Sequence, residues 1–198
     1  MKLSEMTLDH ERWTEDNANG KQIDLKDVRL ESEVLHGATL QLAVFADVVF
    51  DKVRFTSCDF TGASFFNCKF VSCTFEQCAA RKAEFHGCTF QHLKALECML
   101  TKTEWYGGDL QGAKFTDCDF GWSYFNTVDL RSATVTRAKL EGSIWANTKT
   151  HGALFEAADL GERYPARILG TDFTEEGNAE ESSEPSPLWR ATTEDPAP

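Results

Sequence analysis

The stretch CDFTGASFFNCKFVSCTF, residues 58–75, places a Phe at every fifth position. This period continues on both sides, so that residues 21–160 divide into 28 consecutive pentads without an insertion, each centred on a multiple of five. Of these centres, 22 are Leu or Phe. A second slot, two residues before each centre, holds mainly Ala, Cys, Val, Ser or Thr and contains all seven cysteines. One period therefore organises about 70% of the chain.

A period of five fits neither regular element. On an α-helix each step of five residues turns about 500°, so the centres would spread around the helix. On a strand an odd period would send successive centres to opposite faces. Both apolar slots point inward only if the chain turns a corner in every pentad, which predicts a solenoid of stacked coils.

The segments at residues 58–75 and 107–120 (GGDLQGAKFTDCDF) resemble the pentapeptide-repeat family, whose consensus is A(D/N)LXX. The resemblance covers residues 21–160. It implies an all-β fold, a right-handed quadrilateral β-helix with four pentads per coil, and therefore about seven coils. With about 4.8 Å between stacked strands, such a rod would be roughly 34 Å long. The family shares this fold and not one chemistry.

The ends of the repeat predict four regions. Residues 1–20 are expected to cap the first coil, with Thr7 as N-cap of a short helix ending near Asp16 and with Leu8 and Trp13 covering the coil. Residues 21–160 form the β-helix. All five prolines lie beyond Leu160, so residues 161–173 are expected to form a C-terminal cap. Residues 174–198, rich in Glu, Ser and Pro, are expected to be an acidic disordered tail.

Four positions depart from the core pattern. Ala95 is preceded by Leu93, which indicates an exchange of large and small side chains between the two slots. Ala80 has no such partner, so it either leaves a void or lies beside large residues of adjacent coils. Glu33 places a charge in an inward slot of the first coil, where an open end would leave it partly exposed.

The reactive side chains predict no catalytic, cofactor or metal site. In a coil of four pentads, the cysteines at 58, 78, 98 and 118 stack in one column, and a line of thiols cannot surround a zinc ion. The five histidines form no ligand spacing and are expected at the surface. No glycine-rich phosphate loop is present, and an uninterrupted rod offers no concave pocket. We therefore expect a non-enzyme without a cofactor.

The net charge of the chain limits the classes of partner that it is expected to bind. The formal net charge is -12 and the pI is near 4.8, which argues against direct binding of nucleic acid or an anionic membrane. There is no run of about 18 apolar residues and no signal peptide, so a cytoplasmic protein is expected. Residues 21–160 carry a net charge of only -3, because most of the acidity lies in the ends.

One face of the expected rod is unusual, because its outward residues are mainly aromatic and acidic. Exposed aromatic side chains held on a rigid surface suit protein recognition, although scattered exposed apolar residues are also normal. We name this set the aromatic strip and predict that it binds protein: Asp47, Phe66, Glu84, His86, Glu104, Tyr106, Tyr124 and Ile144.

Two functions follow as expectations. Members of the pentapeptide-repeat family serve as adaptor, accessory or immunity factors beside bacterial toxin-delivery systems such as type VI secretion, and a rod with mixed charges suits one such protein partner. Other members mimic DNA and protect DNA gyrase or topoisomerase IV from quinolones or peptide toxins. That role needs dense negative charge along the rod, so the adaptor or immunity role is favoured. A monomer is favoured over a dimer, because the acidic tail is unlike an apolar dimerisation helix.

Overall fold

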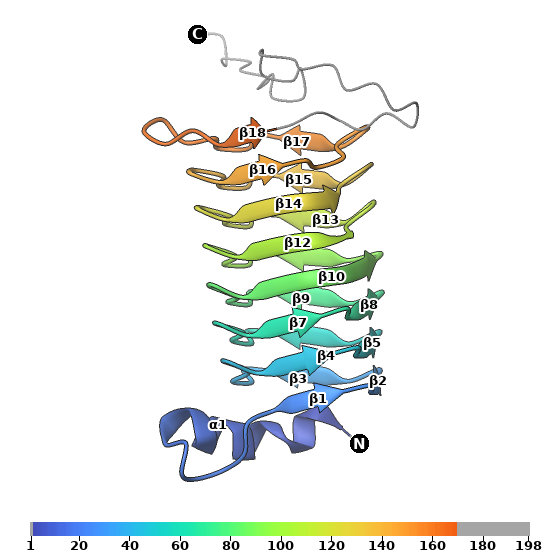
Figure 1. Ribbon diagram of the computed structural model, residues 1–198, viewed down its shortest axis with the longest axis vertical. Coiled ribbons are helices and arrows are strands. Elements are labelled where there is room, and N and C mark those ends of the chain that lie inside the picture. The colour runs from blue at the N-terminus through green and yellow to red at the C-terminus, as the bar shows by residue number, and fades with distance from the viewer. Residues whose placement is uncertain (1, 170–198) are drawn as a thin grey trace, which may run out of the picture.

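The computed structural model describes residues 2–169, and these form a parallel β-solenoid with a short helical segment at its N-terminal end (Figure 1). The 3-10 helix η1 (Leu3–Glu5) and the helix α1 (Thr7–Glu15) precede the first strand. Residues equivalent in adjacent coils are 20 apart, as in the pairing of Leu25 with Phe45, except at the C-terminal end, where Ile144 pairs with Arg167 at a spacing of 23. The expected β-helix of about seven coils is confirmed. The expected tail lies outside the described residues.

Two sheets form three sides of the rod. One sheet covers two sides, and β10, β12 and β14 continue around the corner between them. Its strands are β1 (Asp24–Lys26), β2 (Arg29–Glu31), β4 (Val44–Ala46), β5 (Val49–Asp51), β7 (Ser64–Phe66), β8 (Lys69–Val71), β10 (Glu84–Gln91), β12 (Glu104–Asp109), β14 (Tyr124–Asp129), β16 (Ile144–Ala146) and β18 (Arg167–Leu169).

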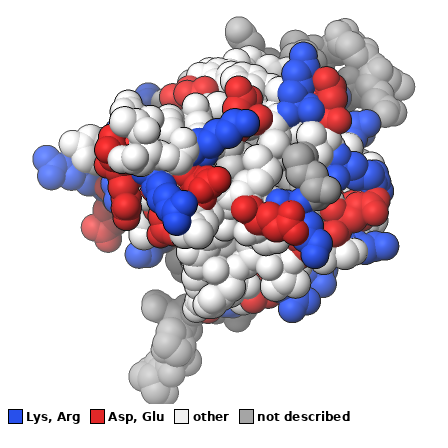
Figure 2. Space-filling model, turned by 90° about the horizontal axis from the view of Figure 1, so that it is seen from below, with Lys and Arg blue, Asp and Glu red and all other residues white. Residues whose placement is uncertain are grey.

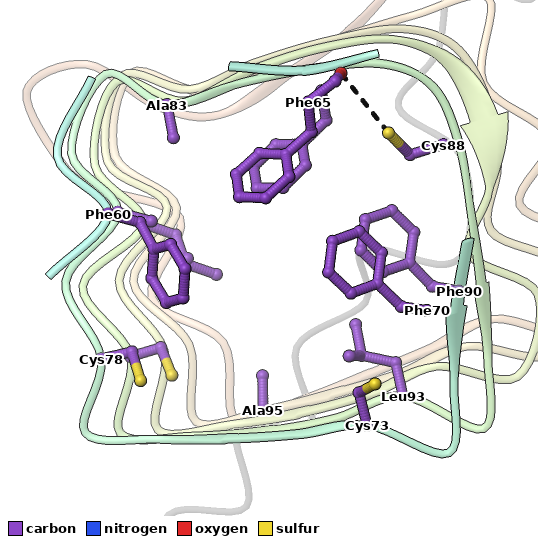
Figure 3. Packing of buried hydrophobic residues seen from close by; sticks show 14 of the residues in the cluster. Phe60, Phe65, Phe70, Cys73, Cys78, Ala83, Cys88, Phe90, Leu93 and Ala95 are labelled. Atoms are coloured by element: carbon purple, nitrogen blue, oxygen red, sulfur yellow. Dashed lines mark hydrogen bonds between the residues drawn. The ribbon is translucent and has the colours of Figure 1, made fainter. Parts of the chain in front are cut away.

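The second sheet forms the third side, with one strand in each of seven coils. Its strands are β3 (Val34–His36), β6 (Arg54–Thr56), β9 (Thr74–Glu76), β11 (Lys94–Leu96), β13 (Lys114–Thr116), β15 (Thr134–Thr136) and β17 (Leu154–Glu156). The fourth side, which runs from Thr39 to Asp159, is held by single parallel bridges between coils. All four sides surround one interior, so the backbone follows a nearly square path (Figure 3).

A left-handed backbone conformation explains how the chain turns at every pentad. Among residues 2–169, twenty non-glycine residues have positive φ, and every one of them lies two positions after a pentad centre. They include side chains as large as Leu42 and Trp122. Because each such residue rotates the chain by about one corner, the two inward slots of successive pentads face the same interior. The period of five therefore comes from a left-handed residue in each pentad, and this residue is often not glycine.

Aromatic rings stacked along the rod form most of the core. In the longest column the ring of Phe65 lies 5.0 Å from that of Phe45 and 4.9 Å from that of Phe85, and the column continues to Trp145. A second column joins Phe50 to Phe70 and Phe90. In the small slot, cysteine thiols donate to carbonyls of the preceding coil, as Cys88 Sγ does to the Phe65 carbonyl (Figure 3).

The undersized centres leave a small apolar cavity of about 30 Å³, which both Ala80 and Ala95 line. Leu93 also faces this cavity, and its inward position in Figure 3 confirms the exchange with Ala95. The exchange therefore fills the space only in part. Ala80 lies beside large residues of neighbouring coils and still leaves a void.

The N-terminal end differs from the sequence-based expectation in three ways. Met6, not Thr7, is the N-cap, and the Thr7 hydroxyl donates to the Ser4 carbonyl. Leu8 is 57% exposed, while Leu3 is buried in its place. Glu33 is buried, because its carboxylate accepts hydrogen bonds from the backbone N–H groups of Leu3 and Ser4. The helical segment thus covers the first coil by satisfying a buried charge.

His10 is also buried, against the expectation of a surface histidine. Its Nδ1 accepts from the Ile23 N–H and its Nε2 donates to the Gln41 carbonyl, both at 2.9 Å. Only the neutral ring with its proton on Nε2 can make both bonds. Burial lowers the pKa of His10, against a smaller opposing effect of the Gln41 hydrogen bond. His10 therefore ties α1 to the first two coils in its neutral form.

Acid is expected to loosen this end of the rod. The unfolded chain takes up the His10 proton near pH 6.5 and the folded chain only at lower pH, so the stability that His10 contributes is lost as pH falls below about 6.5. Hydrogen exchange of the Ile23 amide should be faster at pH 5.5 than at pH 7.5, after correction for intrinsic rates. His92→Gln, at an exposed site, should keep this pH dependence and His10→Gln should remove it; equal behaviour of the two variants would refute the assignment.

Candidate functional site

The structure places the aromatic strip on the side of the rod formed by β4, β7, β10, β12, β14 and β16. Parallel pairing puts Phe66, His86 and Tyr106 at equivalent positions of three adjacent coils. Glu84, Glu104, Tyr124 and Ile144 form a second, neighbouring column of the same strands. Asp47 lies at the corner beside them, where its N–H donates to the Phe66 carbonyl. All eight residues thus lie on or at the edge of one surface.

Four of the rings contact one another. The ring centroids of Phe66 and His86 lie 5.0 Å apart, as do those of His86 and Tyr106, and both pairs are stacked. The edge of Tyr124 then meets Tyr106 at 5.8 Å. We call these four residues the aromatic ladder. Each ring is held by the neighbouring rings and by the β-strand that carries it. The ladder therefore presents a preorganised surface across four coils.

Two carboxylates accompany the ladder. Glu84 lies 3.3 Å from Nε2 of His86, and Glu104 accepts a hydrogen bond of 2.7 Å from the Tyr106 hydroxyl. The hydrogen bond to Glu104 raises the pKa of Tyr106 to about 12. The phenol therefore stays protonated at neutral pH, and each carboxylate keeps acceptor capacity for a partner.

Acidic charge gathers on the strip side. It carries Asp24 and Asp27 besides the strip's own acids, against one base, Lys26. The other three sides carry nearly equal numbers of acids and bases. Seen from the end that carries α1, acidic and basic side chains lie interspersed (Figure 2). By this count of charges, the net negative charge of the rod lies on the strip side.

Other candidate chemistries find little support. The seven cysteines are buried free thiols, and burial raises the pKa of Cys73 to about 11. Within residues 2–169 no three His, Cys, Asp or Glu side chains gather as metal ligands. In the same residues no helix is long and apolar enough to span a bilayer.

One crevice of about 620 Å³ does lie beside Arg29 and Glu33, so the expectation of no concave pocket was wrong. Arg29 there is paired with Glu31 and Asp51.

Sequence reasoning missed a buried hydroxyl network. Trp105 Nε1 donates to the Thr103 hydroxyl at 2.9 Å, and that hydroxyl lies 2.9 Å from the Ser123 hydroxyl. Trp145 repeats the motif with Ser143. In both cases a Trp centre follows a hydroxyl residue in the small slot, and this spacing is the signal that could have revealed the network.

Two family models match the repeat. One, described as "Pentapeptide repeat region", matches residues 48–121, and the other, "Pentapeptide repeats (8 copies)", matches residues 109–144. No curated protein matches the chain.

Solved structures similar to this chain are also pentapeptide-repeat or resistance proteins. HetL from Nostoc sp. strain PCC 7120, involved in heterocyst differentiation regulation, is 16% identical over 81% of this chain and 83% of its own, with a TM-score of 0.48. Rfr23 from Cyanothece 51142 is 12% identical over 83% and 98%, with a TM-score of 0.37. Trypsin-treated QnrB1, a plasmid-mediated fluoroquinolone resistance protein, is 10% identical over 75% and 92%, with a TM-score of 0.30.

At these low identities the likeness does not extend to function. The family models and the pentad register of the strands agree with each other. Over residues 48–144, the sequence therefore matches the models of the pentapeptide-repeat family.

Proposed function

We propose that this protein is a non-catalytic binding scaffold that recognises one protein partner through the aromatic strip. The observation that carries the proposal is the aromatic ladder, four rings that contact one another in sequence over four consecutive coils. Phe66 is 38% exposed, whereas the preceding residue, Phe65, is buried in the core. Fixed aromatic rings lose little conformational freedom on binding, so they contribute more affinity than mobile side chains of the same size.

The charge around the ladder indicates the partner's surface. Glu84 and Glu104 flank the rings, and Asp47 lies at the corner. Arg or Lys side chains of a partner could pair with these carboxylates while lying over the rings. Such pairs would fix the register of the complex and raise its association rate. A bacterial toxin, effector or secretion component with a basic contact surface fits this site, and the chain would then be its adaptor or immunity factor.

Topoisomerase protection is the alternative, and the charge distribution argues against it. A DNA mimic needs net negative charge on the sides that replace the two phosphate backbones, whereas on three sides of this rod the acids are matched by nearly as many bases. A supercoiling assay with purified gyrase, with and without a quinolone, separates the two functions. An effect of this protein on gyrase would overturn the adaptor proposal.

The strip is tested with the double variant Phe66→Ala/Tyr106→Ala. A partner captured from the native host should bind this variant about 30-fold or more weakly, because two central contacts are each worth more than about 1 kcal/mol. Affinity should be measured by calorimetry with the purified partner, and circular dichroism should show an unchanged fold.

A matched control keeps the number of truncated apolar residues the same. Leu96→Ala/Leu154→Ala removes two exposed side chains from β11 and β17, on another side of the rod. This control should bind normally.

The double variant Glu84→Gln/Glu104→Gln tests the charges beside the rings. It should lower mainly the association rate and its salt dependence. Undiminished affinity of the Phe66→Ala/Tyr106→Ala protein would exclude the strip as the binding surface.

A further inference from the structure

The fourth side of the rod carries a group of cations outside the aromatic strip. Arg81, Lys82 and Lys102 are exposed on two adjacent coils, at or next to the left-handed corner. We call these three residues the basic patch. Within residues 2–169 none of the three forms an ion pair, whereas Arg29, Arg131 and Arg137 each do.

On this side, the carboxylates of the flanking coils hydrogen-bond to polar groups other than the three cations. Asp59 accepts from the Thr61 N–H and from the Gln41 amide, and Asp119 accepts from the Gly121 N–H. Between these two acids, the equivalent positions are Ala79 and Met99. The two coils that hold the basic patch therefore present no acid of their own on this side.

Apolar side chains adjoin the basic patch. Met99 is 45% exposed on the same side and in the same coil as Lys102, and Trp122 is 51% exposed at the corner of the next coil. Trp122 lies over Gly142, where an added Cβ would come within 2.7 Å of the indole. Tyr164 packs on the same indole with ring centroids 4.9 Å apart. The surface thus combines three unpaired cations with an apolar border.

Residues 170–198 of this chain have the complementary chemistry. They contain eight acids and one base, Arg190, together with Leu188 and Trp189. The segment follows Leu169 in the last strand, three to four coils from the basic patch, which is about 14–19 Å along the rod. An extended segment of this length could span about 95 Å. Length and charge both permit an intramolecular contact.

We propose that residues 170–198 bind in cis to the basic patch, with their acids on Arg81, Lys82 and Lys102 and an apolar residue against Met99 or Trp122. This contact goes beyond the proposed function, because it uses a different side of the rod. It would neutralise the three cations of the basic patch.

Zero-length crosslinking of the full-length protein tests the contact. A carbodiimide joins a lysine amine to a carboxylate only when the two touch. Trypsin then releases residues 168–190 as one peptide that carries six acids. Lys82 and Lys102 should link to this peptide about five-fold more than Lys94 and Lys114 do. The second pair is the matched control, since its lysines are also exposed and lie one coil apart on β11 and β13.

Charge reversal provides a readout that does not depend on a reactive lysine. Lys82→Glu/Lys102→Glu should shift the NMR amide signals of residues 170–198 toward random-coil values, while Lys94→Glu/Lys114→Glu should leave them unchanged. Equal crosslinking of all four lysines, or equal spectra of the two variants, would overturn the proposal. Crosslinks that grow with protein concentration would also overturn it, because they would show binding between copies.

Discussion

Phe65→Ala is expected to destabilise the protein by about 3–5 kcal/mol, the range for removing a buried aromatic ring. The Phe65 ring is 1% exposed and stacks between Phe45 and Phe85. It also meets the rings of Phe50, Phe60 and Phe70 at an angle. Since a solenoid unit is stabilised mainly by its neighbours, loss of this ring weakens the coils on both sides. Urea unfolding followed by circular dichroism measures the effect.

The next residue in the chain supplies the control. Phe66→Ala removes the same side chain from the outer face of β7, where it is 38% exposed. This variant should lose less than about 1 kcal/mol of stability, and by the proposed function it should lose partner affinity. A similar loss of stability in the two variants would show that the inward and outward slots have been assigned incorrectly.

The sequence predicts the interior of the rod well because its information is periodic. Every centre from Leu25 to Leu140 is buried except Phe75, which is partly exposed. Placing Phe66, His86 and Tyr106 in one column required only the period of 20, and the strands confirm that register. The stacking of their rings and the contact with Tyr124 depend on side-chain orientation, which the period does not contain.

The N-terminal end could not be predicted in the same way, because its residues belong to no repeat. The partners of His10 are Ile23 and Gln41, which lie 13 and 31 residues away in the chain. Glu33 binds the N–H groups of Leu3 and Ser4, about 30 residues earlier. Such contacts arise only once the helical segment has been placed on the first coil. From the sequence alone, Leu8 is expected to cover the first coil, but it is exposed.

Thr103→Val is expected to cost about 1–3 kcal/mol although it barely changes the volume of the side chain. The Thr103 hydroxyl accepts from Trp105 Nε1 and reaches both the Leu100 carbonyl and the Ser123 hydroxyl at 2.9 Å. Both Thr103 and Trp105 are buried. The Val variant would leave the indole N–H without an acceptor in an apolar interior, and the loss should appear as a lower free energy of unfolding in urea.

A double-mutant cycle isolates this hydrogen bond. Trp105→Phe places in the fifth coil the residue that adjacent coils already have, as Phe85 and Phe125. In that background Thr103→Val should cost at least about 1 kcal/mol less, because no indole N–H is left unpaired. Ser143→Ala, beneath Trp145, should repeat the loss at an independent site. Equal costs of Thr103→Val with Trp and with Phe at position 105 would mean that the hydroxyl acts through its other contacts, and the pairing of hydroxyl with Trp would then have no energetic role.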